Sequence, residues 1–277
     1  MNEGFDIEIL PKLVNPGTSN SQYEHCLAIT HFQGKQLIAY GSLNNVVIIS
    51  SSFSLVDLLK EHEKGSEVTS VAWSPFSRLL ASWATDNYLI IWTADNNSDK
   101  WIPHKQKVET KVVCMSWSKG NNVLCAAGEF LQIFSKDSNK TLNTNDSFFN
   151  TRPFIDNIET TFCSHSRDSR FILTLPKKNK GVLLYYKSRK PGIEYEKLLL
   201  QHPSQVISAR WKNSENPHEK CCCMTVSEDH VVRIWYETGV NERLQFNVVA
   251  SLKQEDPILT ASFITPISTI YNNHFTN

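Results

Sequence analysis

The chain has 277 residues, of which 40% are hydrophobic and 10% aromatic, which is enough apolar material for a large domain with a buried core. Its 28 Lys and Arg residues balance 28 Asp and Glu residues, so net charge gives no reason to expect nucleic acid or an anionic surface as partner. The chain has no basic, then apolar, leader and no run of roughly 18 apolar residues, which predicts a cytoplasmic protein. Seven cysteines, three of them adjacent at 221–223, favour reduced thiols over a disulfide framework.

The predicted elements are short β-strands that recur along the chain in one repeating unit. In each unit a strand ends in an aromatic residue, a polar turn leads to an apolar strand, and a turn with Asp or Asn leads to a strand that closes on an aromatic residue. In chain order, copies of this unit cover residues 27–50, 68–92, 112–134, 158–186 and 206–235. A sixth copy begins at residues 258–263. Self-similarity with a period of this length is typical of proteins built from stacked repeats.

The spacing of aromatic and acidic residues within the copies identifies the kind of repeat. Asp86 precedes Trp92 by six residues, and Asp229 precedes Trp235 by the same six. The aromatic residue of the first strand recurs at Trp73, Trp117 and Trp211, in steps of 44 and 94 residues, the second of which spans two units. A pitch of about 40–45 residues resembles that of WD repeats, in which each unit forms one four-stranded blade.

The sequence therefore predicts an all-β fold, a WD-repeat β-propeller with five complete blades and a partial sixth, truncated from a larger, seven-bladed propeller. Residues 25–264 would form the blades, residues 1–24 an N-terminal segment with a candidate closing strand at 5–10, and residues 265–277 an unfinished blade or frayed tail. His202 lies nine residues before Trp211, where WD repeats place the His that bonds to the turn Asp. We expect His202, Asp229 and Trp235 to form one buried polar network.

Two further groups of residues have a structural and a functional interpretation. Lys177, Lys178 and Lys180 form a dense basic cluster at an expected hairpin tip, which is either a solvated loop or a contact for acidic lipid or an acidic partner. Phe148 and Phe149 lie in a long polar connection from 135 to 152. They either hold that connection on a blade or anchor a partner.

The motifs of catalysis and metal binding are missing from the sequence. It contains no glycine-rich phosphate loop, no Gly-x-Ser-x-Gly elbow and no His-Glu-x-x-His motif. The cysteines at 221–223 lack the gaps of a zinc site and alternate between the two faces of a strand, so we expect them to pack in the core. The sequence thus predicts a protein that is not an enzyme and has no catalytic residue, cofactor or metal. A hydrolytic propeller would need acidic or His side chains from several blades to converge on the central channel.

Several stretches resemble a narrower family, the large scaffold subunit of the RAVE complex, known in animals as the DmX-like or rabconnectin proteins. In order along the chain they are residues 37–40, 44–49 with Phe53, 128–131, 202–203, 210–212 and 228–235. The resemblance covers about residues 15–263 and consists mostly of predicted strand residues. Family members are much longer chains, with further blades and a helical region after the first propeller.

The resemblance implies a scaffold that promotes assembly of the vacuolar proton-transporting ATPase and so supports vacuolar and endosomal acidification. The partners that it implies are peripheral-sector subunits of that ATPase, a smaller RAVE subunit and a Skp-type adaptor, with no nucleic acid. It also implies a cytoplasmic protein that is recruited peripherally to vacuolar or endosomal membranes through its partners. The alternative is a WD-repeat adaptor of another complex, such as a ubiquitin ligase or a trafficking coat.

Overall fold

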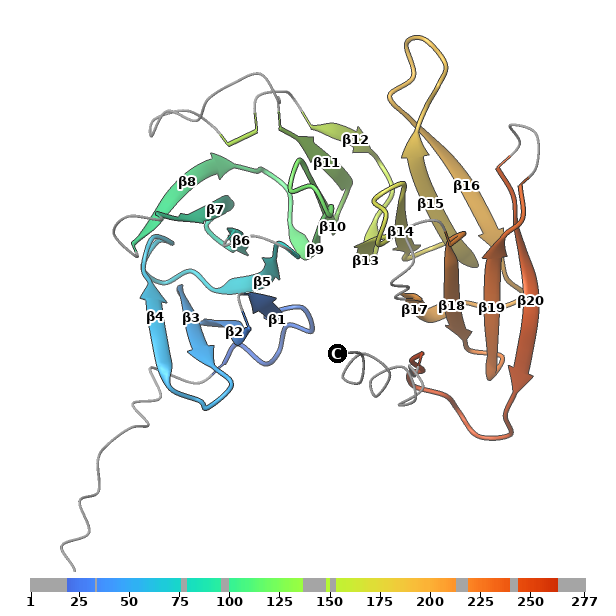
Figure 1. The fold of residues 1–277 in the computed structure, drawn as a ribbon, viewed down its shortest axis with the longest axis horizontal. Helices are drawn as coiled ribbons and strands as arrows, with labels where there is room; N and C mark the ends of the chain where they lie inside the picture. The colour runs from blue at the N-terminus through green and yellow to red at the C-terminus, as the bar shows by residue number, and fades with distance from the viewer. Residues whose placement is uncertain are drawn as a thin grey trace, which may run out of the picture. The chain divides into compact units, whose positions relative to one another are not determined.

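The computed structural model describes residues 19–32, 34–75, 79–95, 100–136, 148–149, 153–212, 219–239 and 244–263. These residues form twenty strands in five four-stranded sheets (Figure 1). The chain divides into two compact units, residues 1–157 with three sheets and residues 158–277 with two. The predicted all-β fold with five blades is therefore confirmed. No helix among the residues described is long and apolar enough to cross a membrane.

The first unit contains three antiparallel sheets, in each of which the strands lie side by side in chain order. The first sheet is β1 (Leu27–Phe32), β2 (Lys35–Ser42), β3 (Asn45–Ser50) and β4 (Leu55–Leu59). The second sheet is β5 (Val68–Trp73), β6 (Leu79–Ala84), β7 (Tyr88–Ala94) and β8 (Trp101–Lys107). The third sheet is β9 (Val112–Trp117), β10 (Val123–Gly128), β11 (Leu131–Ser135) and β12 (Phe154–Asp156).

The second unit contains two sheets of the same design. The fourth sheet is β13 (Thr160–His165), β14 (Phe171–Pro176), β15 (Gly181–Lys187) and β16 (Tyr195–Gln201). The fifth sheet is β17 (Val206–Trp211), β18 (Cys222–Ser227), β19 (Val231–Glu237) and β20 (Phe246–Lys253). The five predicted repeat copies thus correspond one to one with the first three strands of the five sheets.

Burial explains why the inner strands do not alternate between apolar and exposed polar residues. All six residues of β5, β14 and β18 are buried, because both faces of these strands are covered. The turns between second and third strands are equally specific. Asn87 and His230 have φ values of 65° and 60°, in the left-handed region that Asn tolerates well, and each follows an Asp in a tight turn.

The start of the predicted sixth blade differs from expectation. Residues 258–263 form no strand, and the side chain of Leu259 is 83% exposed. An extended segment becomes a strand only when a neighbouring strand satisfies its N–H and C=O groups, and these six residues have no such partner among the residues described. The candidate closing strand at 5–10 and the tail at 265–277 lie outside the described residues.

Candidate functional site

A chain of hydrogen bonds crosses the second sheet from its third strand to the loop before it. The indole Nε1 of Trp92 donates to Ser82 Oγ at 2.8 Å, and His62 Nε2 lies 2.9 Å from the same oxygen. Because the Ser82 oxygen accepts from Trp92, its own hydrogen is free for His62 Nε2. His62 Nδ1 then donates to the Asp86 carboxylate, at 3.0 Å from Oδ2. We call Trp92, Ser82, His62 and Asp86 the second-sheet relay.

The carboxylate at the end of this relay is held in its charged form. The side chains of His62 and Asp86 are both fully buried. Burial by itself raises the pKa of the Asp86 carboxyl, but hydrogen bonds from His62 and from the main-chain N–H of Glu63 outweigh it, so the pKa lies below its usual value. The relay therefore satisfies each of its polar groups internally.

The fifth sheet contains a related chain of bonds that ends differently. Trp235 Nε1 donates to Thr225 Oγ1 at 3.0 Å, and His202 Nε2 lies 2.8 Å from that hydroxyl. His202 Nδ1 donates to the main-chain oxygen of Leu200 at 2.8 Å. The structure thus brings His202 and Trp235 together through a hydroxyl that the sequence analysis had not singled out. We call Trp235, Thr225, His202 and the Leu200 carbonyl the fifth-sheet relay.

The prediction that His202 bonds to Asp229 is wrong. The Asp229 carboxylate instead accepts from Arg233, at 2.5 Å from Nη2, and from the hydroxyl of Ser227 at 2.6 Å. Arg233, four residues further along the chain, lies in the adjacent strand and lowers the pKa of Asp229 strongly. A nearby guanidinium is a stronger partner for a carboxylate than a neutral imidazole, so the His turns to a carbonyl.

Sequence analysis also missed His62. Its position is eleven residues before Trp73, whereas the offset of nine used for His202 leads to Lys64. The connection explains the difference, because six residue steps separate His62 from the start of β5 and only four separate His202 from the start of β17. The signal that could have found His62 is its place in the loop before a strand whose sheet also contains Ser82, Asp86 and Trp92.

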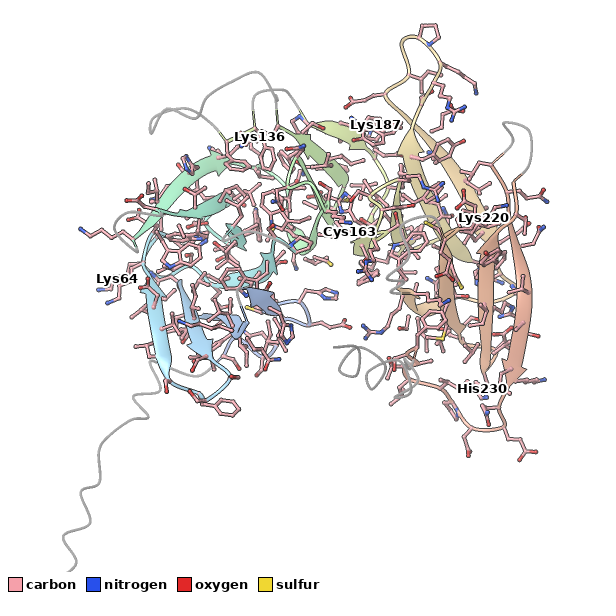
Figure 2. The ribbon with its side chains drawn as sticks, viewed as in Figure 1. Lys64, Lys136, Cys163, Lys187, Lys220 and His230 are labelled. Atoms are coloured by element: carbon pink, nitrogen blue, oxygen red, sulfur yellow. The ribbon has the colours of Figure 1, made fainter. Side chains whose placement is uncertain are left out.

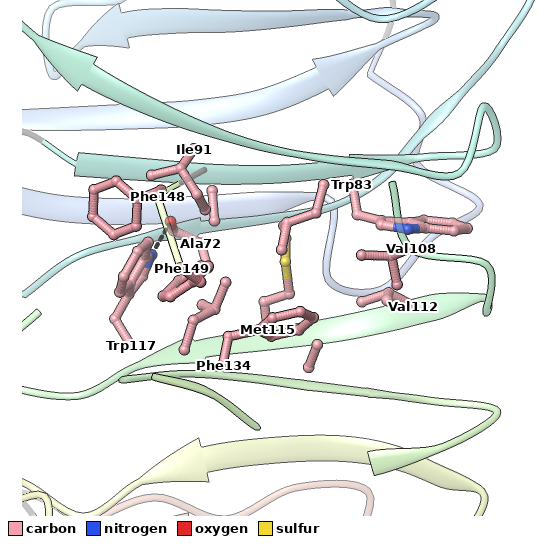
Figure 3. Packing of buried hydrophobic residues seen from close by; sticks show 14 residues of the cluster. Ala72, Trp83, Ile91, Val108, Val112, Met115, Trp117, Phe134, Phe148 and Phe149 are labelled. Atoms are coloured by element: carbon pink, nitrogen blue, oxygen red, sulfur yellow. Dashed lines mark hydrogen bonds between the residues drawn. The ribbon is translucent and has the colours of Figure 1, made fainter. Parts of the chain in front are cut away.

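The tryptophans of the innermost strands join neighbouring sheets. Trp117 Nε1 donates to the main-chain oxygen of Ala72 in the preceding sheet at 3.1 Å, shown as a dashed line in Figure 3. Trp211 Nε1 makes the equivalent bond to Ser164 at 3.0 Å. Trp73, only 8% exposed, lies in a buried cluster with residues of the first sheet and packs against Trp101 of its own sheet, with ring centroids 5.8 Å apart. Trp73 and Trp117 are buried, so they hold blades together and cannot reach a ligand, whereas Trp211 is partly buried.

Phe148 and Phe149 also belong to the core. Each is 2% exposed, and the two rings pack beside Trp117 and Phe134 between the second and third sheets (Figure 3). Ring centroids are 5.9 Å apart for Phe148 and Trp117, and 5.4 Å for Phe149 and Phe134. The interpretation of these residues as a partner anchor is therefore wrong, because a side chain buried among core aromatics cannot reach a partner.

The lysine cluster lies at a surface turn. Lys177, Lys178 and Lys180 are all exposed in the four-residue turn between β14 and β15. The Lys177 ammonium forms an ion pair with Glu159 at 2.6 Å, in which both side chains are partly exposed. Of the predicted candidates for partner contact, this turn is thus the one that the structure leaves on the surface.

The cysteine triplet packs inward. Cys222 and Cys223 are 8% and 0% exposed, and burial raises the pKa of the partly buried Cys221 thiol to about 12. All three thiols are therefore protonated at neutral pH. Across the described part of the chain, no group of three or more His, Cys, Asp or Glu side chains is placed to hold a metal ion.

Comparison with known proteins agrees with this architecture. A family model described as the anaphase-promoting complex subunit 4 WD40 domain matches residues 29–139, which is less than half of the chain. No curated protein sequence matches this chain. The β-propeller domain of Cps50 (Swd1) from Myceliophteria thermophila matches with a TM-score of 0.57 and 15% identity, over 86% of this chain and 72% of that one.

A second structural match is a chain of a humanized mutant of the Chaetomium thermophilum Polycomb Repressive Complex 2. Its TM-score is 0.57 at 12% identity, over 76% of this chain and 55% of that one, so the present chain spans little more than half of that protein's length. At such identities the likeness concerns the fold. The class that the sheets, the relays and these matches define is the β-propeller. In particular, the chain has the fold of WD40-repeat propellers, and its residues 29–139 match the WD40 family model.

Proposed function

We propose that this domain is a scaffold of a RAVE-type complex and promotes assembly of the vacuolar proton-transporting ATPase. The observation that carries the proposal is the ordered series of stretches that resemble the RAVE scaffold subunit, at 37–40, 44–49, 128–131, 202–203, 210–212 and 228–235. Most of these residues lie in strands β2, β3, β10, β11, β17 and β19, and fewer than half of them are buried. A match carried mostly by strand residues supports common descent more than a common binding surface.

The arrangement of the polar residues favours a scaffold over an enzyme. The buried His and Asp side chains of the second-sheet relay bond to one another, and His202 bonds to a carbonyl and a hydroxyl. A hydrolytic site would require such groups to face a substrate. In this structure these His and Asp side chains instead bond to groups in the turns and strands of their own sheets.

Purification of the tagged protein tests the proposal. We expect it to bring down peripheral-sector subunits of the ATPase, a smaller RAVE subunit and a Skp-type adaptor, and to be cytoplasmic with peripheral recruitment to vacuolar or endosomal membranes. Loss of the protein should leave these compartments insufficiently acidic. Normal acidification in cells that lack the protein would contradict the assignment.

A second candidate is an adaptor of another multisubunit complex, such as a ubiquitin ligase or a trafficking coat. It is favoured by the match of residues 29–139 to the WD40 domain of anaphase-promoting complex subunit 4. The same purification separates the two candidates, because recovery of such a complex without ATPase subunits would support the adaptor.

A further inference from the structure

The turns between the second and third strands of the five sheets differ sharply in charge. Four of them, at residues 43–44, 85–87, 129–130 and 228–230, contain no Lys or Arg, and three of these four carry Asp or Glu. The turn of the fourth sheet, residues 177–180, instead contains three lysines and no acid. We call residues 177–180 the lysine turn.

The lysine turn has a defined shape. Lys177 N donates to the main-chain oxygen of Glu159 at 2.9 Å, and Gly181 N donates to Asn179 O at 3.0 Å. The Gln205 side-chain amide donates to Pro176 O at 3.2 Å, at the base of the turn. The strand that leads into it, β14, is buried at all six residues. The lysines are therefore displayed from a rigid base, which lowers the conformational cost of binding.

The lysine turn is also free of the structural duty that the second-sheet turn performs. In the second sheet, the turn residue Asp86 closes the relay with His62. The loop before the fourth sheet, residues 157–159, contains no His, and the Thr174 hydroxyl donates to Leu183 O at 3.2 Å instead of serving a relay. Lys177 pairs with Glu159, but among the described residues no hydrogen bond or ion pair explains why lysine occupies positions 178 and 180.

We propose that the lysine turn contacts an acidic segment of a protein partner, an inference that rests on the proposed scaffold function. Lys177 is paired with Glu159, and among the described residues neither Lys178 nor Lys180 has an ion-pair partner. The charge of Lys178 also acts on the Glu159 carboxylate, but without an ion pair. Two such ammonium groups are fewer than the roughly four to eight basic residues of lipid-binding clusters. An acidic peptide can add main-chain and side-chain contacts around the two charges, whereas a lipid surface offers mainly charge.

The test measures binding of a fluorescein-labelled peptide of alternating Glu and Gly to the full chain by fluorescence anisotropy. The variant is Lys178→Glu with Lys180→Glu, which leaves the pair of Lys177 and Glu159 intact. The matched control is Lys187→Glu with Arg189→Glu, which changes the charge equally in the same sheet. Strand β15 begins at Gly181, directly after the lysine turn, and ends at Lys187, so the control charges lie beyond the far end of that strand (Lys187 is labelled in Figure 2).

We expect the unmodified protein to bind the peptide at low salt and to lose it as salt screens the charges. The lysine-turn variant should bind at least about tenfold more weakly, and the control should stay within about twofold. No binding by the unmodified protein, or equal losses in both variants, would overturn the proposal. Binding to phosphatidylserine vesicles through the same lysines, without peptide binding, would overturn the proposed partner and indicate an anionic membrane instead. Peptide binding through the turn in a protein that recovers no ATPase subunits would refute only the RAVE assignment.

Discussion

Replacement of His62 by Ala tests whether the second-sheet relay stabilises the first unit. The change leaves Asp86 buried and charged without its imidazole partner, and it removes the group that orients the Ser82 hydroxyl. Loss of one partner of a buried pair costs about 3–5 kcal/mol, and a single hydrogen bond to a charged group contributes about 1.5–3 kcal/mol. We therefore expect the free energy of unfolding of the first unit to fall by about 3–5 kcal/mol, a large part of the stability of a typical domain.

Urea unfolding followed by tryptophan fluorescence measures this change, because five of the seven tryptophans precede residue 157. Global fitting with a separate transition for each unit avoids a false two-state treatment. The control is Asp86→Asn, which removes the charge but keeps an oxygen that accepts a hydrogen bond from His62, and it should cost less. A loss below about 1 kcal/mol for His62→Ala would refute the reasoning, since it is no more than the net value of one ordinary hydrogen bond.

Three further predictions concern other parts of the core. Burial lowers the pKa of His202 below its ordinary value, and the nearby charges of Asp229 and Arg233 are paired with each other. The unfolded chain therefore binds a proton more readily than the folded one, so the second unit should lose stability as pH falls below about 6.5. The variant His202→Gln has no titrating group at this position, so calorimetry should show that its second unit does not lose this stability as pH falls. The same pH profile in the variant and the unmodified protein would contradict the prediction. Arg170→Lys should lower the melting temperature of the second unit by several degrees, because it loses the two 2.7 Å bonds to Glu237, and an unchanged value would show that the pair is not stabilising. Phe149→Ala should cost about 3–5 kcal/mol in urea unfolding, against almost nothing for Leu199→Ala at a 47% exposed site, and similar costs at the two sites would refute the core position.

The outer strands show where sequence pattern loses its power. The predicted copies correspond to the first three strands of each sheet, but β8 (Trp101–Lys107) and β12 (Phe154–Asp156) lie outside them. Their residues alternate or are polar, because an outer strand is covered less completely than an inner one. They form strands because the neighbouring third strand offers hydrogen-bond partners, which is a tertiary effect.

The sequence by itself determined the repeat, since the copies at 68–92 and 206–235 share a spacing that only a common unit explains. It also indicated which strands are buried, because strands covered on both faces carry apolar residues on both of them. Only the tertiary structure decided the polar partners: Arg233 takes Asp229, His202 turns to Leu200, and His62 completes the relay of the second sheet. Only the tertiary structure showed that Phe148 and Phe149, which lie in a connection of polar sequence, are buried in the core. Periodicity records which residues avoid water, whereas the choice of partner depends on distances across turns and loops whose lengths differ from one copy to the next.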